Sequence, residues 1–155
     1  MNVFNNSPAI KRFQHSPWPF QASFQTPLKD LDRFVSTFLS AHRPIDGGCV
    51  TIDGYVFEPK TLNAFLAQYS LSEQSTHGIT FEAENQTELE ALLRATLADW
   101  IDFLFISRPK AFAIYADHDE YTTFYANRRG NLSKIVQAMR KAEYNQVNEY
   151  ERTFR

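Results

Sequence analysis

A run of four polar, ionisable residues interrupts two segments rich in aromatic and β-branched residues: Asp117, His118, Asp119 and Glu120. Carboxylates and imidazoles are the groups that serve most often as general acids and bases, and they also bind metal ions. A metal site needs several ligands that converge on one ion, usually from separate elements. Alternate side chains of an extended segment point to opposite sides, so this run offers at most half of such a site.

The histidines that would have to complete a metal site are scattered along the chain: His15, His42 and His77. No paired spacing such as HxxxH or HxH supports a metal site. Aspartate and histidine tolerate turn conformations, and the tip of a hairpin is polar. We therefore expect residues 117–120 to form a hairpin turn that also contacts a partner, with no metal and no cofactor. A metal-dependent hydrolase that uses these four residues is the alternative.

Motifs typical of enzymes are missing from the rest of the sequence. Cys49 follows two glycines at a predicted strand start, where small buried cysteines are common. There is no GxSxG, GxGxxG, Walker-type or CxxC sequence, and only five glycines are available for loops that bind phosphate. The sequence therefore predicts a protein that is not an enzyme and has no catalytic residues.

A basic segment, NRRGNLSK (residues 127–134), is a candidate anion-binding site. Gly130 favours an interruption of regular secondary structure, and the N-terminus of the helix that follows exposes free backbone N–H groups. Arg128, Arg129 and Lys134 are near these groups in the sequence. A polar connection between a strand and a helix is the alternative. A binding module that senses an anion or a nucleotide is accordingly another candidate function.

The segment YTTFYA (residues 121–126) places aromatic side chains on both faces of a predicted strand. Tyr121 and Tyr125 fall on one face and Phe124 on the other. Tyrosines bury large areas at protein interfaces at modest entropic cost, so Tyr121 and Tyr125 are candidate partner contacts. Core packing under another helix explains the pattern equally well.

The charge is distributed unevenly over the 155 residues, although the formal net charge is only −2. Residues 82–127 carry nine acids and three bases, whereas residues 128–155 carry seven bases and three acids. An acidic segment in the middle of the chain suits a basic protein partner. Ordinary solvent-exposed loops and helix faces, however, give the same distribution of charge. Glu82 and Glu84 are therefore predicted to contact the partner together with residues 117–120. The small net charge argues against direct binding of nucleic acid.

Length and composition predict one soluble cytoplasmic domain. A chain of this length with 43% hydrophobic residues builds one compact core. A single cysteine cannot form an intramolecular disulfide, which favours a reducing compartment. The N-terminus lacks the apolar segment of a secretory signal, and the longest apolar run, WIDFLFI, is too short to span a membrane.

Hydrophobic periodicity predicts an α+β fold, a single-domain sandwich of a largely antiparallel sheet with about four helices packed on it. Because residues 1–25 are rich in proline, they are expected to form an extended N-terminal arm on a domain of residues 26–155. Thr26 is the expected N-cap of the first helix, with Leu28 on its buried face. Asn85 or Thr87 is expected to cap the helix at residues 85–100, and Asn131 or Ser133 the helix at residues 131–142. Helices are predicted at residues 26–43, 58–69, 85–100 and 131–142. Strands are predicted at residues 49–58 (a strand pair that turns at Asp53-Gly54, or one bent strand), 78–84, 102–107, 111–116, 121–126 and 146–154.

The segment FAIYADHDEYTTFYANRRGNLSKI, together with the later VNEYERTF, resembles small bacterial immunity proteins of contact-dependent growth inhibition and related toxin delivery systems. In that group a strand that ends in acidic and histidine residues is followed by an aromatic strand, a short basic or polar loop, a helix and a closing strand. The resemblance covers about residues 100–155. It implies a non-enzymatic cytoplasmic antitoxin that binds a cognate toxin domain and blocks its active site. An acidic surface would suit a basic nuclease.

Overall fold

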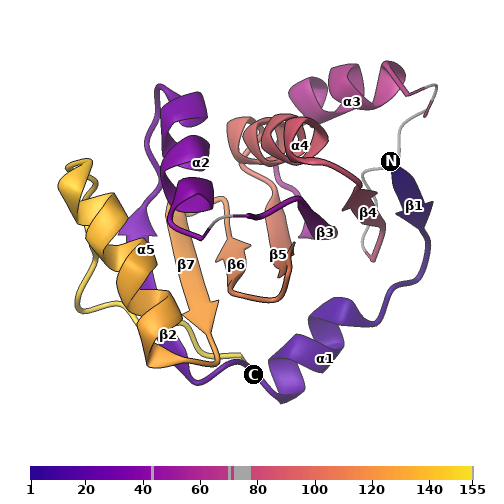
Figure 1. Cartoon of the computed structure of the whole chain (residues 1–155). Helices are drawn as coiled ribbons and strands as arrows, with labels where there is room; N and C mark the ends of the chain where they lie inside the picture. The colour runs from indigo at the N-terminus through magenta and orange to yellow at the C-terminus, as the bar shows by residue number, and fades with distance from the viewer. Residues whose placement is uncertain (43, 70, 72–77, 155) are drawn as a thin grey trace.

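The structure is a computed structural model and describes residues 1–42, 44–69, 71 and 78–154. One sheet of antiparallel strands runs through it in the order β1-β4-β3-β5-β6-β7-β2 (Figure 1). The strands are β1 (Asn2–Phe4), β2 (Phe20–Gln25), β3 (Gly47–Gly54), β4 (Thr80–Ala83), β5 (Asp102–Arg108), β6 (Ala113–Ala116) and β7 (Tyr121–Ala126). The predicted α+β fold with a largely antiparallel sheet is confirmed.

Helices cover both faces of the sheet. They are α1 (Ala9–His15), α2 (Leu31–Ser40), α3 (Lys60–Ala67), α4 (Gln86–Ala98) and α5 (Arg129–Lys141). Figure 1 shows α2, α4 and α5 on one side, with α3 packed on α4, and α1 close to the C-terminal end of the chain. Among the helices of the described residues, none has the length and apolar character that crossing a lipid bilayer requires.

The main core lies between α2–α5 and one face of the sheet. Alternate residues of the central strands point into it, among them Phe103, Phe105 and Phe124, which are fully buried. Phe38 of α2 contacts Phe112 and Phe124 edge-on, with ring centroids 6.3 and 5.4 Å apart. Edge-to-face packing suits phenylalanine well, so this layer accounts for much of the high Phe content.

A second, smaller core covers the opposite face of the sheet. Leu104, Tyr115 and Tyr125 point to this side and are buried beneath α1 and the C-terminal segment. The ring centroid of Phe13 in α1 lies 5.0 Å from that of Tyr125 and 5.9 Å from that of Phe154. Strands β5, β6 and β7 are therefore buried on both faces, which explains the nearly continuous apolar runs FLFI in β5 and AIYA in β6.

The prediction that residues 1–25 form an extended arm is wrong. They form β1, α1 and β2, and the two strands are the opposite edges of the sheet. Pro8 directly precedes α1, where a missing N–H donor costs nothing. Pro17 and Pro19 lie in the connection between α1 and β2. The prolines thus separate regular elements and do not prevent them.

Helix α2 begins five residues later than the sequence pattern predicts. Thr26 does not cap it, because its N–H donates to the Glu120 carbonyl (2.7 Å) and its hydroxyl is 2.6 Å from that of Thr122. Thr26 therefore continues the pairing between β2 and β7. Leu28, which was expected on the buried helix face, lies in the connection before the helix and is 74% exposed.

Residues 49–58 contain one bent strand and no hairpin. β3 pairs with β5 along its length, with a register irregularity between Ile52 and Gly54. The chain then leaves the sheet, so residues 55–58 form a loop that leads into α3. Of the two alternatives for this segment, the bent strand is confirmed and the turn at Asp53-Gly54 is wrong.

The closing strand predicted at residues 146–154 is absent. Only an isolated bridge, Phe24↔Gln146, joins this segment to the free edge of β2. Beyond Val147 the chain turns and crosses the outer face of the sheet, where Phe154 packs on α1 and β6. Its alternating pattern therefore reflects packing of single side chains, not strand pairing.

The other predicted elements are confirmed within a few residues. The capping prediction for α4 also holds, because Asn85 Oδ1 accepts the N–H of Glu88 (2.9 Å) and Glu88 Oε1 accepts the N–H of Glu84 (3.0 Å). Helix α5 begins at Arg129, so Asn131 and Ser133, the expected caps, lie inside it.

Replacing Phe124 tests whether the packing of the main core determines stability. Phe124→Ala is expected to lower the free energy of unfolding by about 3–5 kcal/mol, because it removes a fully buried ring and leaves a cavity. The exposed Leu28 provides the control, since Leu28→Ala should change stability by no more than about 0.5 kcal/mol. Urea denaturation followed by circular dichroism measures both. Similar losses for the two variants would contradict this assignment of the core.

Candidate functional site

Residues 117–120 form the turn between β6 and β7, as predicted. Asp117 Oδ1 accepts the N–H groups of Asp119 (2.9 Å) and Tyr121 (3.3 Å), and Glu120 adopts the left-handed conformation with φ of 69°. Aspartate commonly closes turns in this way. The Asp117 carboxylate therefore holds the backbone of the turn at two positions.

The second oxygen of Asp117 is held in an ion pair with Arg152. The distance from Arg152 Nη2 to Asp117 Oδ2 is 2.5 Å, and the two side chains are only 10% and 11% exposed. Arg152 Nε also donates to Thr123 Oγ1 (3.3 Å), and the guanidinium lies over the ring of Tyr115, 4.6 Å from its centroid. Arg152 of the same chain therefore neutralises Asp117 and leaves little of its carboxylate exposed for a partner.

His118 is fixed by Asp102, the first residue of β5. Asp102 Oδ1 accepts the backbone N–H of His118 (2.8 Å) and lies 2.9 Å from its Nδ1. Asp119 Oδ1 is 3.6 Å from Nε2. The hydrogen bond to Asp102 raises the pKa of His118 above its ordinary value of 6.5, and the surrounding carboxylates act in the same direction. The imidazole and Asp119 remain exposed to solvent.

The structure does not complete a metal site around the turn. Among the described residues, no three His, Cys, Asp or Glu side chains are placed to hold one ion. Of the other histidines, His42 is bonded to the Asn131 carbonyl (2.7 Å) and stacks on Phe112 in the main core. His15 lies at the end of α1. His77 lies outside the described residues.

The two tyrosines predicted to contact a partner differ in exposure. Tyr121 is half-buried and stacks on Tyr150, with ring centroids 4.4 Å apart and an interplanar angle of 15°. Tyr125 is fully buried beneath Phe13, and burial raises the pKa of its hydroxyl. The placement of Tyr125 on an exposed docking surface is therefore wrong, since α1 covers that face of the sheet.

Glu82 and Glu84 lie away from the turn. Glu82 is in β4 and accepts a hydrogen bond from Asn2 Nδ2 (3.0 Å). Glu84 follows β4, where its carbonyl accepts from Arg108 Nη2 (3.2 Å). Asp102 and Arg108 are the two ends of β5, so Glu84 and the turn lie at opposite ends of the sheet. The structure does not bring the two predicted acidic groups together.

Three consecutive exposed apolar residues lie at the same end of the sheet as the turn. Tyr55, Val56 and Phe57 are 46%, 57% and 56% exposed. They follow Gly54, which pairs with Asp102, and Asp102 in turn holds His118. The sequence reading missed them because it placed them in a strand. Their position between the Asp-Gly pair and Pro59 is the signal that could have indicated a loop.

Leu28 completes this end of the molecule on the other side of the turn. It follows β2, two residues after Thr26, whose N–H is bonded to the Glu120 carbonyl. We refer to the following residues as the tip surface: Leu28, Tyr55, Val56, Phe57, Asp102, His118, Asp119 and Glu120. It consists of exposed apolar side chains on both sides of an acidic centre.

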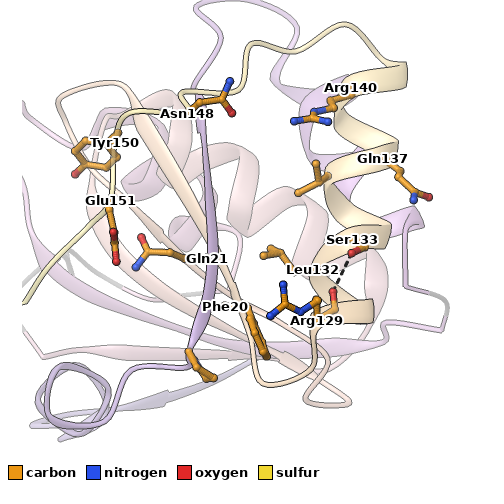
Figure 2. A pocket seen from close by; sticks show the side chains of 12 residues that line it. Phe20, Gln21, Arg129, Leu132, Ser133, Gln137, Arg140, Asn148, Tyr150 and Glu151 are labelled. Carbon is orange, nitrogen blue, oxygen red and sulfur yellow. Dashed lines mark hydrogen bonds between the residues drawn. The ribbon is translucent and has the colours of Figure 1, made fainter.

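The predicted basic trio does not form one site. Arg129 lines a groove between α5 and β2 (Figure 2). Arg128 precedes α5, and neither it nor Lys134 lines this groove. The groove has a volume of about 640 Å³, and Arg140, which the sequence reading missed, also lines it. The guanidinium of Arg129 lies over the ring of Phe20, 4.8 Å from its centroid.

The ion pair between Asp117 and Arg152 should have a large effect on stability. Arg152→Met is expected to cost about 3 kcal/mol, because it leaves a buried carboxylate without its cation. Adding Asp117→Asn should recover part of that loss. The exposed pair of Arg94 and Asp32, at 2.7 Å, is the control, since Arg94→Met should cost no more than about 1 kcal/mol. Chemical denaturation at neutral pH measures all of these variants. Equal losses for Arg152→Met and Arg94→Met would contradict the burial of the pair.

The contact between His118 and Asp102 predicts a pH dependence. A raised folded-state pKa means that His118 stabilises the fold most below pH 6.5, its ordinary pKa, and that this contribution is lost as the pH rises through the folded pKa. An NMR titration of the imidazole should give a pKa above 6.5, and Asp102→Asn should lower it. An unchanged pKa in Asp102→Asn would show that Asp102 does not hold the imidazolium.

Comparison with known proteins gives no relative from which a function can be transferred. No protein-family model matches the chain, and neither a curated protein nor a solved structure matches it significantly. The arrangement of the tip surface and the groove is therefore the basis for proposing a function.

Proposed function

We propose that this chain is a non-enzymatic cytoplasmic immunity protein that binds a cognate, basic protein toxin domain, such as a nuclease, and blocks its active site. The observation that carries the proposal is the tip surface. It joins exposed aromatic and aliphatic side chains to acidic ones at a single end of the sheet.

The apolar part of the tip surface supports binding of a protein. Soluble proteins rarely expose several large apolar residues in sequence unless they meet a partner. Aromatic side chains such as those of Tyr55 and Phe57 are enriched among the residues that dominate binding energy. Leu28, the most exposed of the large apolar side chains in the described residues, adds apolar area on the opposite side of the turn.

The acidic part supports a basic partner. Asp119 is 72% exposed, and Glu120 is beside it, while Arg152 has already neutralised Asp117. Complementary charge raises the rate of association and excludes like-charged partners. Because Asp117 and Asp102 fix the turn before any partner arrives, little conformational entropy is lost on binding.

The proposal predicts a toxin gene beside this protein's gene, and calorimetric titration with the toxin domain encoded there is the test. We expect a tight complex in which the toxin is inactive, and Phe57→Ala should weaken the complex about 30-fold or more, because an exposed aromatic ring at the tip surface is expected to be a dominant contact. Phe4→Ala is the matched control, because Phe4 is 50% exposed but lies on β1 at an edge of the sheet. A wild-type protein that does not bind the toxin would contradict the proposal.

Reversing the charge at each end of the sheet separates the two acidic groups in the same titration. Asp119→Lys with Glu120→Lys should weaken binding about tenfold and slow association, most strongly at low salt. Glu82→Lys with Glu84→Lys makes the same change in net charge at the other end and should have little effect. The opposite ranking would place the partner on β4 and refute the role of the tip surface.

A further inference from the structure

The groove between β2 and α5 is lined by residues that are not part of the tip surface. Arg129, Ser133, Gln137 and Arg140 of α5 form one wall, and Asn148, Tyr150 and Glu151 face them across β2 (Figure 2). We propose that this groove binds an extended, acidic peptide segment of a partner protein. The proposal concerns a second surface and does not depend on the proposed function.

The edge of β2 is open within the groove. Gln25 N–H donates to the Asn145 carbonyl (2.9 Å) and Val147 N–H donates to the Ser23 carbonyl (2.8 Å). Odd-numbered residues of β2 thus direct their backbone groups away from β7, and by the alternation of a strand Gln21 does the same. A peptide strand can add to such an edge through main-chain hydrogen bonds.

The C-terminal segment leaves this edge free. After Val147 it turns, with the Tyr150 N–H 3.4 Å from the Val147 carbonyl, and it crosses to the outer face. There the side chain of Gln21 donates to the Arg152 carbonyl (3.2 Å) and accepts the Arg152 N–H (2.9 Å). The segment is therefore anchored by the side chain of Gln21 and leaves the backbone groups of Gln21 facing the groove.

The charge of the helical wall favours an acidic ligand. Residues 128–141 contain five bases and no acid. Arg129 and Arg140 are 11 positions apart, about 16 Å along the helix axis, which is the length of about five residues of an extended strand. Arg140 Nε donates a hydrogen bond to Gln146 Oε1 (2.7 Å), and the other N–H groups of the guanidinium can donate to a carboxylate. Glu151 lines the opposite wall, and because its carboxylate repels like charge, the acidic side chains of the ligand are expected to face α5.

The aromatic residues of the groove favour a peptide over single-stranded nucleic acid. Proteins that bind single strands stack bases on free aromatic rings. Here the guanidinium of Arg129 already lies over the ring of Phe20, and Tyr150 is stacked on Tyr121. The ring faces used by these contacts are occupied, whereas the edge of β2 is open.

Fluorescence anisotropy with a labelled peptide of five Glu-Val repeats tests the proposal. The full chain should bind this peptide saturably and should not bind a Lys-Val peptide of equal length. In a ¹⁵N spectrum of the wild-type protein, the amide of Gln21 should shift on addition of the peptide. Lack of binding to the Glu-Val peptide, or shifts confined to the tip surface, would overturn the proposal.

Two pairs of variants locate the contact. The double variant Arg129→Ala with Arg140→Ala should weaken binding about tenfold or more, because both charge-assisted contacts are lost. Lys134→Ala with Lys141→Ala removes the same charge from α5 outside the groove and should weaken binding less than about threefold by long-range attraction alone. Equal losses for the two pairs would reduce the interaction to nonspecific attraction and overturn the site.

The main-chain contact has its own test. Gln21→Pro removes the N–H that faces the groove, and Gln21→Ala removes only the side chain that holds Arg152. Binding should be weaker in Gln21→Pro than in Gln21→Ala, and equal affinities would exclude addition of a strand at this edge.

Binding of decathymidylate that depends on Arg129 and Arg140, without binding of the Glu-Val peptide, would assign the groove to single-stranded nucleic acid instead. Variants of the tip surface should bind the peptide normally.

Discussion

The central strands of this sheet are apolar on both faces, and both faces must therefore be covered. Helices α2, α4 and α5 cover one face, and the other is covered by α1 and the C-terminal segment, which come from opposite ends of the chain. Neither of these two pieces buries Tyr115 and Tyr125 alone. The ion pair of Asp117 and Arg152 joins this second layer to the hairpin turn, so that the covering layer and the shape of the turn are stabilised together.

This constraint explains why the two candidate surfaces lie where they do. With both faces of the central strands covered, the strand ends and the sheet edges are the places where polar chemistry and exposed apolar groups meet solvent. The tip surface collects loops from one end of the sheet. The groove lies at the edge formed by β2, where the C-terminal segment turns away to cover the outer face.

The sequence allowed the elements with strong local patterns to be predicted, and it failed where distant residues decide the structure. The periodicity of α4 is local and was predicted correctly, and its cap, Asn85, was one of the two predicted candidates. The start of α2 was not, because Thr26 is drawn into pairing with Thr122, about a hundred positions away. The local sequence of residues 117–120 identified the acidic turn. It could not show that Arg152 would neutralise Asp117, or that Tyr55 to Phe57 would be left outside the sheet, since both depend on tertiary packing.

The pairing of β2 with β7 joins segments that are synthesised at very different times, as the contact between the hydroxyls of Ser23 and Thr123, 100 positions apart, shows. At translation rates of roughly 5–20 residues per second, β2 has to wait about 5–20 s on the ribosome before its neighbour exists. Contacts this distant in sequence also raise the contact order, which slows folding of the complete chain. Until β7 is synthesised, β2 has no neighbouring strand in the sheet, and its apolar residues Phe20, Ala22 and Phe24 remain outside the core.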